Sequence, residues 1–585
     1  MGLLHYLILL LCVSYAYASK AFIEDSSYED GSEGPGPSQS FLATTLTPVQ
    51  WNFVLPTNDS TSNNVSSGLI FNAPRGKDVK QPGGVIWNQD GTMVWSAADF
   101  GETLLFYPVK YKNKDHILIW TGQFSAAGFG FGFNLLVNQS YAVVANFTTK
   151  LDNGALADFH DAVITTNNTA IMTAYTTQPQ DLTQFQGPNP GFIAGGAFQE
   201  LNIDSGNVVF TWNSLDHIDP SECYVTPGTS GGSTDSPWDY FVSAYCDQLT
   251  ETRPTTSFNS QHINSVDKDS SGNYLISSRH CHALYYLDGT SGDILWRIGG
   301  KNSTFNMGDG TLFSWQHEAR WHGNNQISLF DNAASDWESD GPTARGLLLN
   351  VDVNAKTVTL ARQVYPFVQS VSTSQGSVQI LDNGNMLVGF GSRPYFAEYD
   401  SNGNMLYSVH FGIGDVQSYR AVRATWVGRP NTKPTLGFSS DISSDFYASW
   451  NGATEVATWE LFGSTADQPQ KAISLNTSSR TDFETTIFYT GTTNYDFYQV
   501  AAKNDKGQHL AYSDFRSRSG NVVAAATNQT VDAPPLDSTD SDSSNNSTSS
   551  NGNGGAKGNG AGSTLDSHMV ITIAVAVLLA LLTNQ

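Results

Sequence analysis

The chain has 585 residues, and its composition is that of a large folded protein: 39% of the residues are hydrophobic, 12% are aromatic and only 14% are charged. Acidic residues outnumber basic ones by 54 to 29, which gives a formal net charge of -25. This charge repels polyanions, so it argues against nucleic acid as a partner and restricts small anions to places where local donors overcome the field.

The first residues have the features of a signal peptide. An apolar run extends from Leu3 to Val13, and small residues stand at Ala16 and Ala18, the two positions that a signal peptidase reads. We therefore predict that residues 1–18 are removed and that a disordered, acidic segment follows over residues 19–48. A buried helix is the alternative for the apolar run, but the Ser/Gly-rich stretch after it offers no packing partner.

Residues 49–428 predict an all-β domain. Helical periodicity is almost absent, and short β-branched and aromatic runs alternate with turns, as in "DSSGNYLISSR", "WHGNNQISLFD" and "LDNGNMLVGFG". These three units begin about every 50 to 60 residues, a spacing typical of four-stranded propeller blades. The segment accommodates five or six such blades.

The pattern changes after residue 428. Residues 429–525 contain a Trp-bearing early strand in "FYASWNGATEVATWELFG" and a later strand in "DFYQVAAKNDKGQHLAYSDF". They predict a small β-sandwich that resembles a fibronectin type III domain. One more, divergent propeller blade is the alternative.

The C-terminal region predicts a lipid anchor. Residues 526–560 are rich in Ser, Asn and Gly and indicate a flexible stalk. The apolar run from Met569 to Leu582 is shorter than the roughly 20 residues that a helix needs to cross a bilayer, and no basic cluster follows it. Small residues from Asn559 to Ala561 match a glycosylphosphatidylinositol (GPI) signal, with attachment at Asn559 and removal of residues 561–585. A short tail anchor is the alternative.

Glycosylation sequons are frequent, which fits a chain that passes through the secretory pathway to the cell surface. They are at Asn58, Asn64, Asn138, Asn146, Asn167, Asn302, Asn476, Asn528, Asn545 and Asn546. Each is a predicted attachment site in the extracellular protein.

Four cysteines are present, and Cys12 lies in the predicted signal peptide. Cys223 and Cys246 flank a Gly/Ser/Thr-rich loop, so we predict a disulfide between them in an oxidising compartment. Cys281 is then left over, as a buried, inert thiol or as a reactive one beside His280 and His282.

Histidines and one arginine are concentrated between Gln261 and Gly300. If this stretch is extended, His262 and Asn264 share one face of a strand, and Arg279 lies on the face opposite to His280 and His282. In a propeller the innermost strands of all blades point their ends toward one central channel, so polar residues from different blades converge there.

Five short motifs resemble the arylsulfate sulfotransferases, in particular their fungal secreted branch. They are "LADFHDAVIT", "HINSVD", "SSRH", "QHEARW" and "SLFDN". The resemblance covers residues 49–428 and implies an all-β fold with a six-bladed β-propeller, followed here by the predicted sandwich. It also implies the transfer of a sulfuryl group from a phenolic sulfate ester to another phenol, without a nucleotide sulfate donor or any other cofactor.

The resemblance assigns roles to individual residues. His317 of "WQHEAR" corresponds to the nucleophile, Arg279 and His262 to catalytic residues, and Asn264 and His160 to residues that bind the sulfuryl group. The residue types suit this chemistry, because a planar arginine fork holds two oxygens at once and neutral imidazole attacks sulfur to form sulfohistidine. A metal is not required for it.

Neighbouring residues have structural interpretations. We assign His280, His282 and His322 to structural roles. Glu318 and Arg320 either orient His317 or pair with each other, and Asp331 and Asn332 either close a loop around the site or form an ordinary Asx turn.

Three other functions compete with this hypothesis. The "GTSGDILWRIGG" segment resembles the docking element of quinone-dependent oxidoreductases, a structural motif that says little about a cofactor. His160, His262 and His317 have the residue types of a zinc site, although the charge of Arg279 disfavours a nearby cation. A non-catalytic, GPI-anchored surface protein that binds other molecules is equally compatible with the anchor and the sequons.

Overall fold

The computed structural model describes residues 21–58, 62–124, 128–185, 189, 191–225, 257–439, 445–466, 471–524 and 529–534. These residues belong to one compact unit that ends at Pro534. Their secondary structure is almost entirely β. No helix in these ranges is long and apolar enough to cross a membrane.

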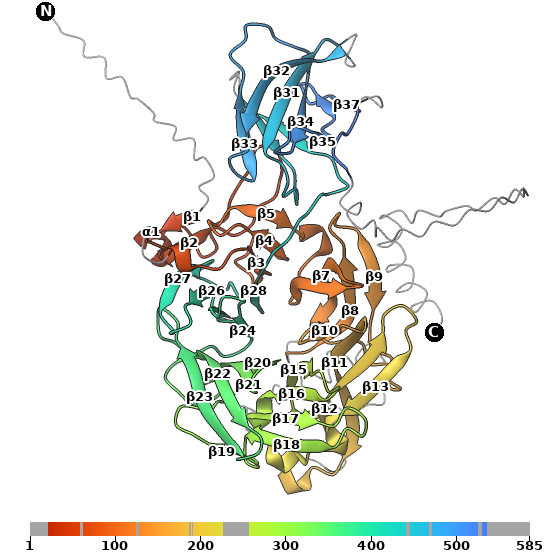
Figure 1. Cartoon of the computed structure of the whole chain (residues 1–585), viewed down its shortest axis with the longest axis vertical. Coiled ribbons are helices and arrows are strands. Elements are labelled where there is room, and N and C mark those ends of the chain that lie inside the picture. Colours follow the sequence, from red (N-terminus) through yellow and green to blue (C-terminus); the bar gives the residue numbers. More distant parts are fainter. Residues whose placement is uncertain are drawn as a thin grey trace, which may run out of the picture. The chain divides into compact units, whose positions relative to one another are not determined.

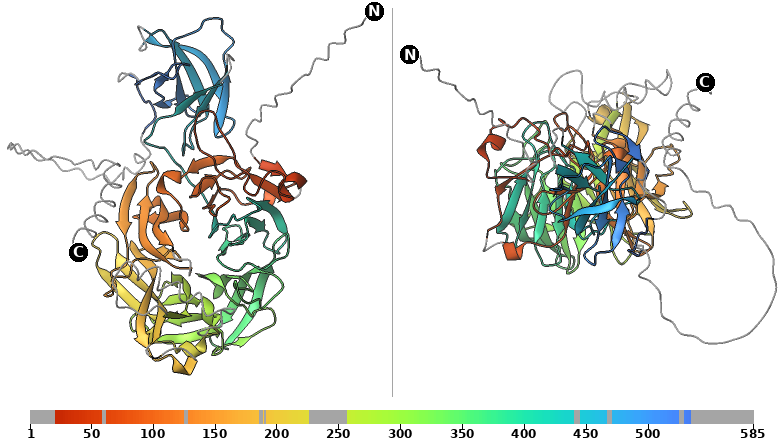
Figure 2. Two further views of the ribbon diagram at one scale, coloured as in Figure 1. Left: turned by 180° about the vertical axis from the view of Figure 1, so that it is seen from behind. Right: turned by 90° about the horizontal axis from the view of Figure 1, so that it is seen from above.

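Six sheets surround a common axis and form the blades of a propeller (Figures 1 and 2). From the innermost strand outward, blade 1 contains β28 (Ala421–Ala424), β3 (Leu69–Asn72), β4 (Val85–Trp87) and β5 (Met93–Ser96). Blade 2 contains β6 (Phe106–Tyr111), β7 (Lys114–Phe124), β8 (Gly130–Val137) and β9 (Val143–Phe147). Blade 3 contains β10 (Ala162–Ile164), β11 (Thr169–Gln180), β12 (Gly191–Asn202) and β13 (Val208–Asn213), and β14 (Ser257–Gln261) pairs with β12.

The next three blades continue in chain order. Blade 4 contains β15 (Ile263–Lys268), β16 (Tyr274–Ser278), β17 (Ala283–Leu287) and β18 (Ile294–Gly299). Blade 5 contains β20 (His317–His322), β21 (Gln326–Asp331), β22 (Arg345–Asp352), β23 (Thr357–Val364) and β19 (Asn306–Met307). Blade 6 contains β24 (Ser377–Ile380), β25 (Met386–Gly389), β26 (Tyr395–Tyr399), β27 (Met405–His410), β2 (Trp51–Leu55) and β1 (Ala21–Ile23). The predicted six-bladed propeller is therefore confirmed.

Both ends of the domain close the ring. The last strand, β28, supplies the innermost strand of blade 1 and pairs antiparallel with β3, while β2 from the beginning of the chain pairs antiparallel with β27 of blade 6. The seam between these blades is apolar, because Trp51 is fully buried with its ring centroid 4.9 Å from Trp87 and 5.1 Å from Phe396. Burial of such large aromatic surfaces stabilises the closed ring.

The segment before β2 is ordered from Ala21 onward, so the prediction that residues 19–48 are disordered was wrong for the described residues 21–48. The short helix α1 (Ser26–Glu29) begins at Asp25, whose carboxylate accepts hydrogen bonds from the backbone N–H groups of Ser27 and Tyr28. Tyr28 is fully buried and donates to the Gln50 carbonyl at 2.8 Å. The acidic composition predicted disorder, but in the structure these acidic side chains cap the helix and form hydrogen bonds within the fold.

Short 3₁₀ turns occur between strands of the propeller. They are η1 (Ser62–Asn64), η2 (Ala98–Phe100), η3 (Thr183–Phe185), η4 (Ser214–Asp216), η5 (Pro220–Glu222) and η6 (Arg279–Cys281). Only η6 carries residues of the predicted site.

The predicted β-sandwich is also confirmed. One sheet contains β29 (Thr435–Phe438), β30 (Asp445–Ser449) and β33 (Glu484–Phe488). The other contains β32 (Ile473–Ser479), β31 (Thr458–Ser464), β34 (Phe497–Lys503), β35 (His509–Tyr512), β36 (Phe515–Arg516) and β37 (Val522–Val523). A shared core that includes Trp450, Trp459 and Tyr498 lies between two sheets, which one additional blade would not provide.

Candidate active site

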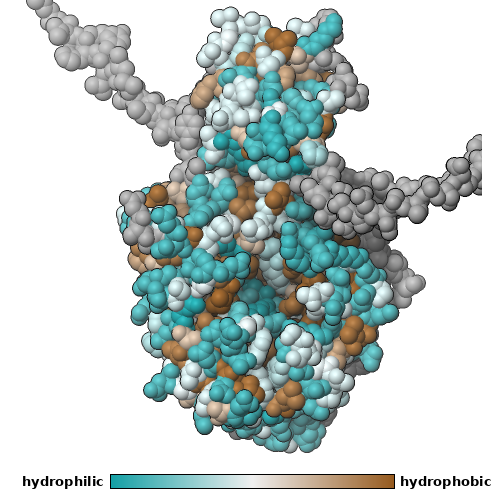
Figure 3. All heavy atoms as spheres, in the orientation of Figure 1, coloured by the Kyte–Doolittle hydropathy of each residue, from teal (hydrophilic) through white to brown (hydrophobic). Residues whose placement is uncertain are grey.

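The predicted site residues stand where innermost strands of the propeller begin. His160 lies just before β10 of blade 3, His262 just before β15 of blade 4, and His317 is the first residue of β20 in blade 5. Because these strand ends meet at the axis, the structure brings together residues that are distant in the sequence. The face of the molecule in Figure 3 is hollowed near the middle of the ring.

Two histidines form a buried pair. The Nε2 atoms of His262 and His160 lie 2.8 Å apart, and Asp158 accepts a hydrogen bond from Nδ1 of His160. Since Nδ1 of His160 carries its proton toward Asp158, one further N–H bridges the two Nε2 atoms. Burial first, and then the neighbouring His160, hold the pKa of His262 well below its usual value.

His317 presents one unprotonated nitrogen. Its Nδ1 is 2.7 Å from Oδ1 of Asn332, and the Asn332 amide nitrogen donates to the carbonyls of Ser372 and Gln375, which identifies Oδ1 as the acceptor. Nδ1 therefore carries the proton, and Nε2 accepts a hydrogen bond from the backbone N–H of Gln375 at 3.2 Å. Burial and then the charge of Arg279 hold the pKa of His317 well below its usual value.

Arg279 is buried without an acidic partner. Its side chain is 6% exposed, Nη2 donates to the Thr373 carbonyl at 2.7 Å, and Nε has no hydrogen-bond partner. No carboxylate of the described residues is within ion-pair distance of it, although the charge of Asp336 opposes the effect of burial on its pKa. Its guanidinium carbon lies 5.2 Å from the Trp315 ring and 5.9 Å from the Trp337 ring. Burial lowers the pKa of Arg279 to about 10, so it remains charged at neutral pH.

One loop connects the nucleophile and the arginine. Thr373 and Gln375, which contact Arg279 and His317 respectively, lie two residues apart just before β24. The loop turns sharply at Gly376, where φ is 114° and a Cβ atom would lie 2.2 Å from the Phe330 ring. This close approach fixes both contacts from a single segment of blade 6.

Asn264 contributes to the same centre. It is fully buried, its Nδ2 donates to the carbonyl of Gln316 at 2.6 Å, and its Oδ1 has no partner among the described residues. The bond to Gln316 holds the residue directly before His317, so Asn264 acts on the position of His317 besides offering one unused amide hydrogen.

A buried ionic network supports the floor of the site. Asp161 binds Arg320 through both oxygens, at 2.7 and 2.8 Å, and Arg420 at 2.9 Å, while Glu318 lies 3.2 Å from Arg420. Burial alone would raise the pKa of Asp161, but Arg320 and Arg420 outweigh it and lower that pKa to about 2. Glu318 and Arg320 thus belong to this network, and the hydrogen bond that orients His317 comes from Asn332.

The prediction of side-chain directions from strand alternation is wrong after Ser278. The chain leaves β16 there and forms η6, and His282 adopts a left-handed conformation with φ of 49°. His280 therefore does not point away from Arg279, because Nη1 of Arg279 lies 3.3 Å from Nε2 of His280. His322, in contrast, lies 2.8 Å from the Ser328 hydroxyl, as a structural role requires.

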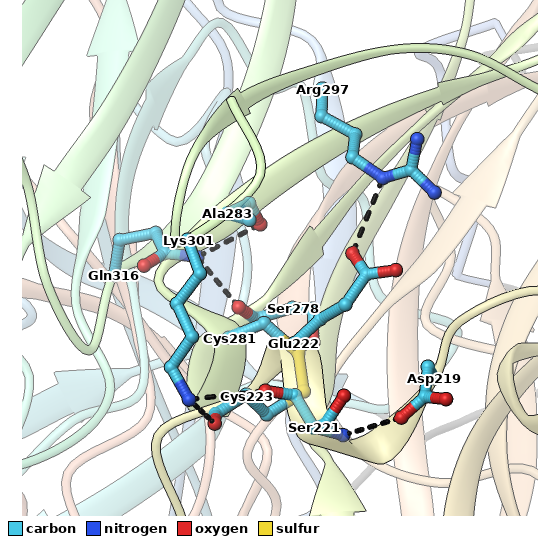
Figure 4. The surroundings of a disulfide bond; sticks show 10 residues. All are labelled: Asp219, Ser221, Glu222, Cys223, Ser278, Cys281, Ala283, Arg297, Lys301 and Gln316. Carbon is cyan, nitrogen blue, oxygen red and sulfur yellow. Dashed lines mark hydrogen bonds and ion pairs between the residues drawn. A yellow bond between two sulfur atoms is a disulfide. The ribbon is translucent and has the colours of Figure 1, made fainter. Parts of the chain in front are cut away.

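The predicted disulfide between Cys223 and Cys246 was also wrong. Cys223 is bonded to Cys281 (Figure 4), so Cys281 is no free thiol, and Cys246 lies outside the described residues. Spacing along the chain suggested a local loop, whereas the fold places Cys223 against η6, 58 residues away. Lys301 supports this junction by donating to the Cys223 carbonyl at 2.6 Å (Figure 4).

Further residues of the centre escaped the sequence analysis. Tyr419 is 1% exposed, its hydroxyl has no partner among the described residues, and its ring centroid lies 6.2 Å from His317 and 5.9 Å from His160. Asp158 lies two residues before His160 in a motif already noted, but Tyr419 and Arg420 belong to no motif. Their position directly before the closing strand β28 was the available signal.

The structure describes only some of the residues predicted for a metal site, for glycosylation and for the terminal signals. Among the described residues, no three His, Cys, Asp or Glu side chains are arranged to hold a metal ion. Exposed sequon residues of the described part are Asn58, Asn64, Asn146, Asn167 and Asn302, and Asn138 and Asn476 are half-buried. The predicted signal peptide and anchor, with Asn528, Asn545, Asn546 and Asn559, lie outside the described residues.

The fold and site define a six-bladed propeller with a buried histidine and arginine centre on its axis. Residues 107–412, more than half of the chain, match the arylsulfotransferase (ASST) family, and the chain belongs to this family. No curated protein matches it.

Solved structures with similar folds are distant. A Bacteroides caccae protein of unknown function is 11% identical, with 61% of this chain and 98% of that one covered and a TM-score of 0.34. The β-propeller domain of Cps50 (Swd1) from Myceliophteria thermophila is 8% identical, with coverages of 60% and 95% and a TM-score of 0.24. Sqt1 of Saccharomyces cerevisiae is 9% identical, with coverages of 70% and 84% and a TM-score of 0.28.

The disulfide assignment is testable by mass spectrometry. Non-reducing digestion after alkylation is expected to yield a peptide that links Cys223 to Cys281, with Cys246 alkylated, because Cys223 and Cys281 are bonded to each other among the described residues. A peptide that links Cys223 to Cys246 would contradict this connectivity. A sample reduced before alkylation serves as the control.

Proposed function

We propose that this protein is an arylsulfate sulfotransferase of the fungal secreted branch, which moves a sulfuryl group between phenols through sulfohistidine at His317. The observation that carries the proposal is a buried, charged Arg279 without a carboxylate partner, held by the same loop as the unprotonated Nε2 of His317. Family membership supports arylsulfotransfer in general. A charged group buried in this way is an attractive position for an anionic substrate.

The first half-reaction uses the lone pair of His317. Its Nε2 attacks the sulfur of a phenolic sulfate ester, the bond from sulfur to the aryl oxygen breaks, and the aryloxide leaves with the electron pair. The N–H of Gln375 now occupies the place to which this lone pair points, so the substrate displaces that contact. Asn332 keeps the proton on Nδ1 and accepts its hydrogen bond while positive charge develops on the ring.

Negative charge on the three sulfuryl oxygens requires fixed donors, as in loose phosphoryl transfer. Arg279 supplies its unpaired Nε–H, and the N–H that now bridges His262 and His160 turns to the substrate when a sulfuryl oxygen replaces its acceptor within the pair. Asn264 adds its second amide hydrogen. Such preorganised donors in a buried site stabilise the transition state more strongly than the same groups in water.

The second half-reaction regenerates the enzyme. The phenolate of the acceptor attacks the same sulfur, the bond between Nε2 and sulfur breaks, and His317 returns to neutral imidazole. Phenols suit both steps, because a leaving group with a pKa near 10 departs far more easily than an alkoxide.

We further propose that the protein is secreted and held at the cell surface by a GPI anchor. The apolar termini carry the two signals, from Leu3 to Val13 and from Met569 to Leu582. The disulfide between Cys223 and Cys281 and the exposed sequon asparagines support passage through an oxidising secretory compartment.

Removing the nucleophile tests the central proposal. With p-nitrophenyl sulfate as donor and phenol as acceptor, His317→Ala is expected to lower the rate of nitrophenolate release by about a thousandfold or more, because no other group takes up sulfur. His322→Ala on the same strand serves as the matched control and should retain activity. Release that does not need phenol, or release that survives in His317→Ala, would contradict transfer through His317.

The pH dependence reports the protonation of His317. Only neutral imidazole attacks, and the pKa of His317 lies well below its usual value, so the acid limb of kcat/KM is expected below pH 6.5. Arg279→Met removes the second largest cause of that shift and should move the limb upward, toward 6.5, in the residual activity. Samples are quenched in alkali so that nitrophenolate readings are comparable at every pH. An acid limb that does not move in Arg279→Met would contradict the effect of Arg279 on the pKa of His317.

The anchor is testable on intact cells. Phosphatidylinositol-specific phospholipase C is expected to release the protein into the medium, since a lipid would be its attachment to the membrane. A variant that ends after Gly560 should appear in the medium without the enzyme. Retention of the full chain after effective phospholipase treatment would contradict a GPI anchor.

A further inference from the structure

A cavity whose chemistry differs from that of the candidate active site lies beside His282, at the end of η6. It is a groove of about 930 Å³, which neither His317 nor Arg279 lines. Residues of blades 4 and 5, together with Tyr224 from the segment after η5, form its walls; among them are His282, Leu312, Phe313, Asp340 and Arg345. This volume is at the upper end of the range for clefts that enclose a drug-sized ligand.

His282 contributes an aromatic ring to the groove. The residue is 8% exposed, and its Nε2 has no hydrogen-bond partner among the described residues. Its ring stacks on Tyr224 with centroids 4.3 Å apart and meets the edge of Trp315 at 4.5 Å. A buried ring nitrogen without a partner is rare in folded proteins, and because this nitrogen is buried, His282 faces the groove with its ring rather than with Nε2.

The uncompensated charge of the groove is negative. Glu338 and Asp340 are exposed and form no ion pair with a cation of the described residues. Asp331 and Arg345 also line the groove, but they pair with each other at 2.9 Å. Lys301 lies 5.0 Å from the Tyr224 ring and donates to two backbone carbonyls, so its positive charge offsets one of the two unpaired negative charges and leaves the other. An anionic ligand would therefore be repelled and a cationic one attracted.

The walls of the groove are aromatic and apolar. Leu312 is 68% exposed and Tyr224 is 43% exposed, and Phe313, Pro342 and Tyr365 also face the cavity. The disulfide next to Tyr224 and the hydrogen bond from its N–H to the His280 carbonyl, at 2.9 Å, hold this wall in place. Exposed aromatic surface held in one conformation favours an aromatic ligand, because little conformational entropy is lost on binding.

We propose that this groove is a binding site, distinct from the His317 centre, for a short cationic peptide that carries an aromatic side chain. The aromatic ring packs between Tyr224 and Leu312, and basic groups face Glu338 and Asp340. The size of the groove suits a few residues of a peptide better than a single phenol.

Three probes of equal size test the charge preference on the full chain. They are the capped tripeptides Lys-Phe-Lys, Gln-Phe-Gln and Glu-Phe-Glu, and their affinities are measured by titration calorimetry. The lysine probe is expected to bind about tenfold more tightly than the glutamine probe, and the glutamate probe most weakly. Phenylalanine has no hydroxyl, so the measurement does not depend on sulfuryl transfer, and its failure leaves the proposed activity untouched.

Variants then locate the binding. Glu338→Gln combined with Asp340→Asn should weaken the lysine probe about three- to tenfold, and Tyr224→Ala should weaken all three probes by a similar factor. Asp382→Asn combined with Asp505→Asn removes the same charge from exposed sites elsewhere and should leave the affinity unchanged. Equal affinities for the three probes would overturn the proposal, because binding would then not depend on charge. Equal losses in the two double variants would also overturn it, because binding would then follow the overall negative charge of the protein.

Discussion

The closed ring is the constraint on which the rest of this molecule depends. Each blade has its innermost strand at the axis, and His160, His262, His317 and Arg420 stand at or just before the starts of such strands, whereas Arg279 follows the end of the neighbouring strand β16. Closure by β28 and β2 is therefore more than a device for stability, because β28 carries Tyr419 and Arg420 into the centre. A ring left open at this seam would separate Asp161 from one of its two arginines.

The buried arginines of the centre differ in how their charges are balanced. Arg320 and Arg420 face Asp161 and Glu318, so their charges are balanced within the protein. Arg279 forms no such ion pair: a backbone carbonyl, His280 and two indole rings contact it, and Asp336 acts on it only through its charge. The N–H groups of Arg279 are therefore less fully occupied than those of Arg320 and Arg420, which fits the anion-binding role proposed for it.

The sequence predicted the architecture well because its signal is repetitive. Strand and turn alternation at a regular spacing defines blades, and motifs at equivalent places identify His160, His262, Arg279 and His317, which the fold brings to one centre. Local rules failed where a contact comes from another blade or where the backbone changes conformation. The pairing of Cys223 depends on the position of η6, and strand alternation cannot be extended past Ser278. Tyr419 follows no periodic pattern, so only its neighbours in space reveal it.

The disulfide between Cys223 and Cys281 links the candidate active site to the groove. Cys281 ends η6, whose first residue is Arg279, and Tyr224 follows Cys223 in the wall of the groove. Gln316, directly before His317, donates to the carbonyls of Ser278 and Ala283 on either side of the same turn (Figure 4). A displacement of η6 would therefore change Arg279, the support of His317 and the groove together. The covalent bond suppresses that displacement, which explains why a chain with so few cysteines places two of them here.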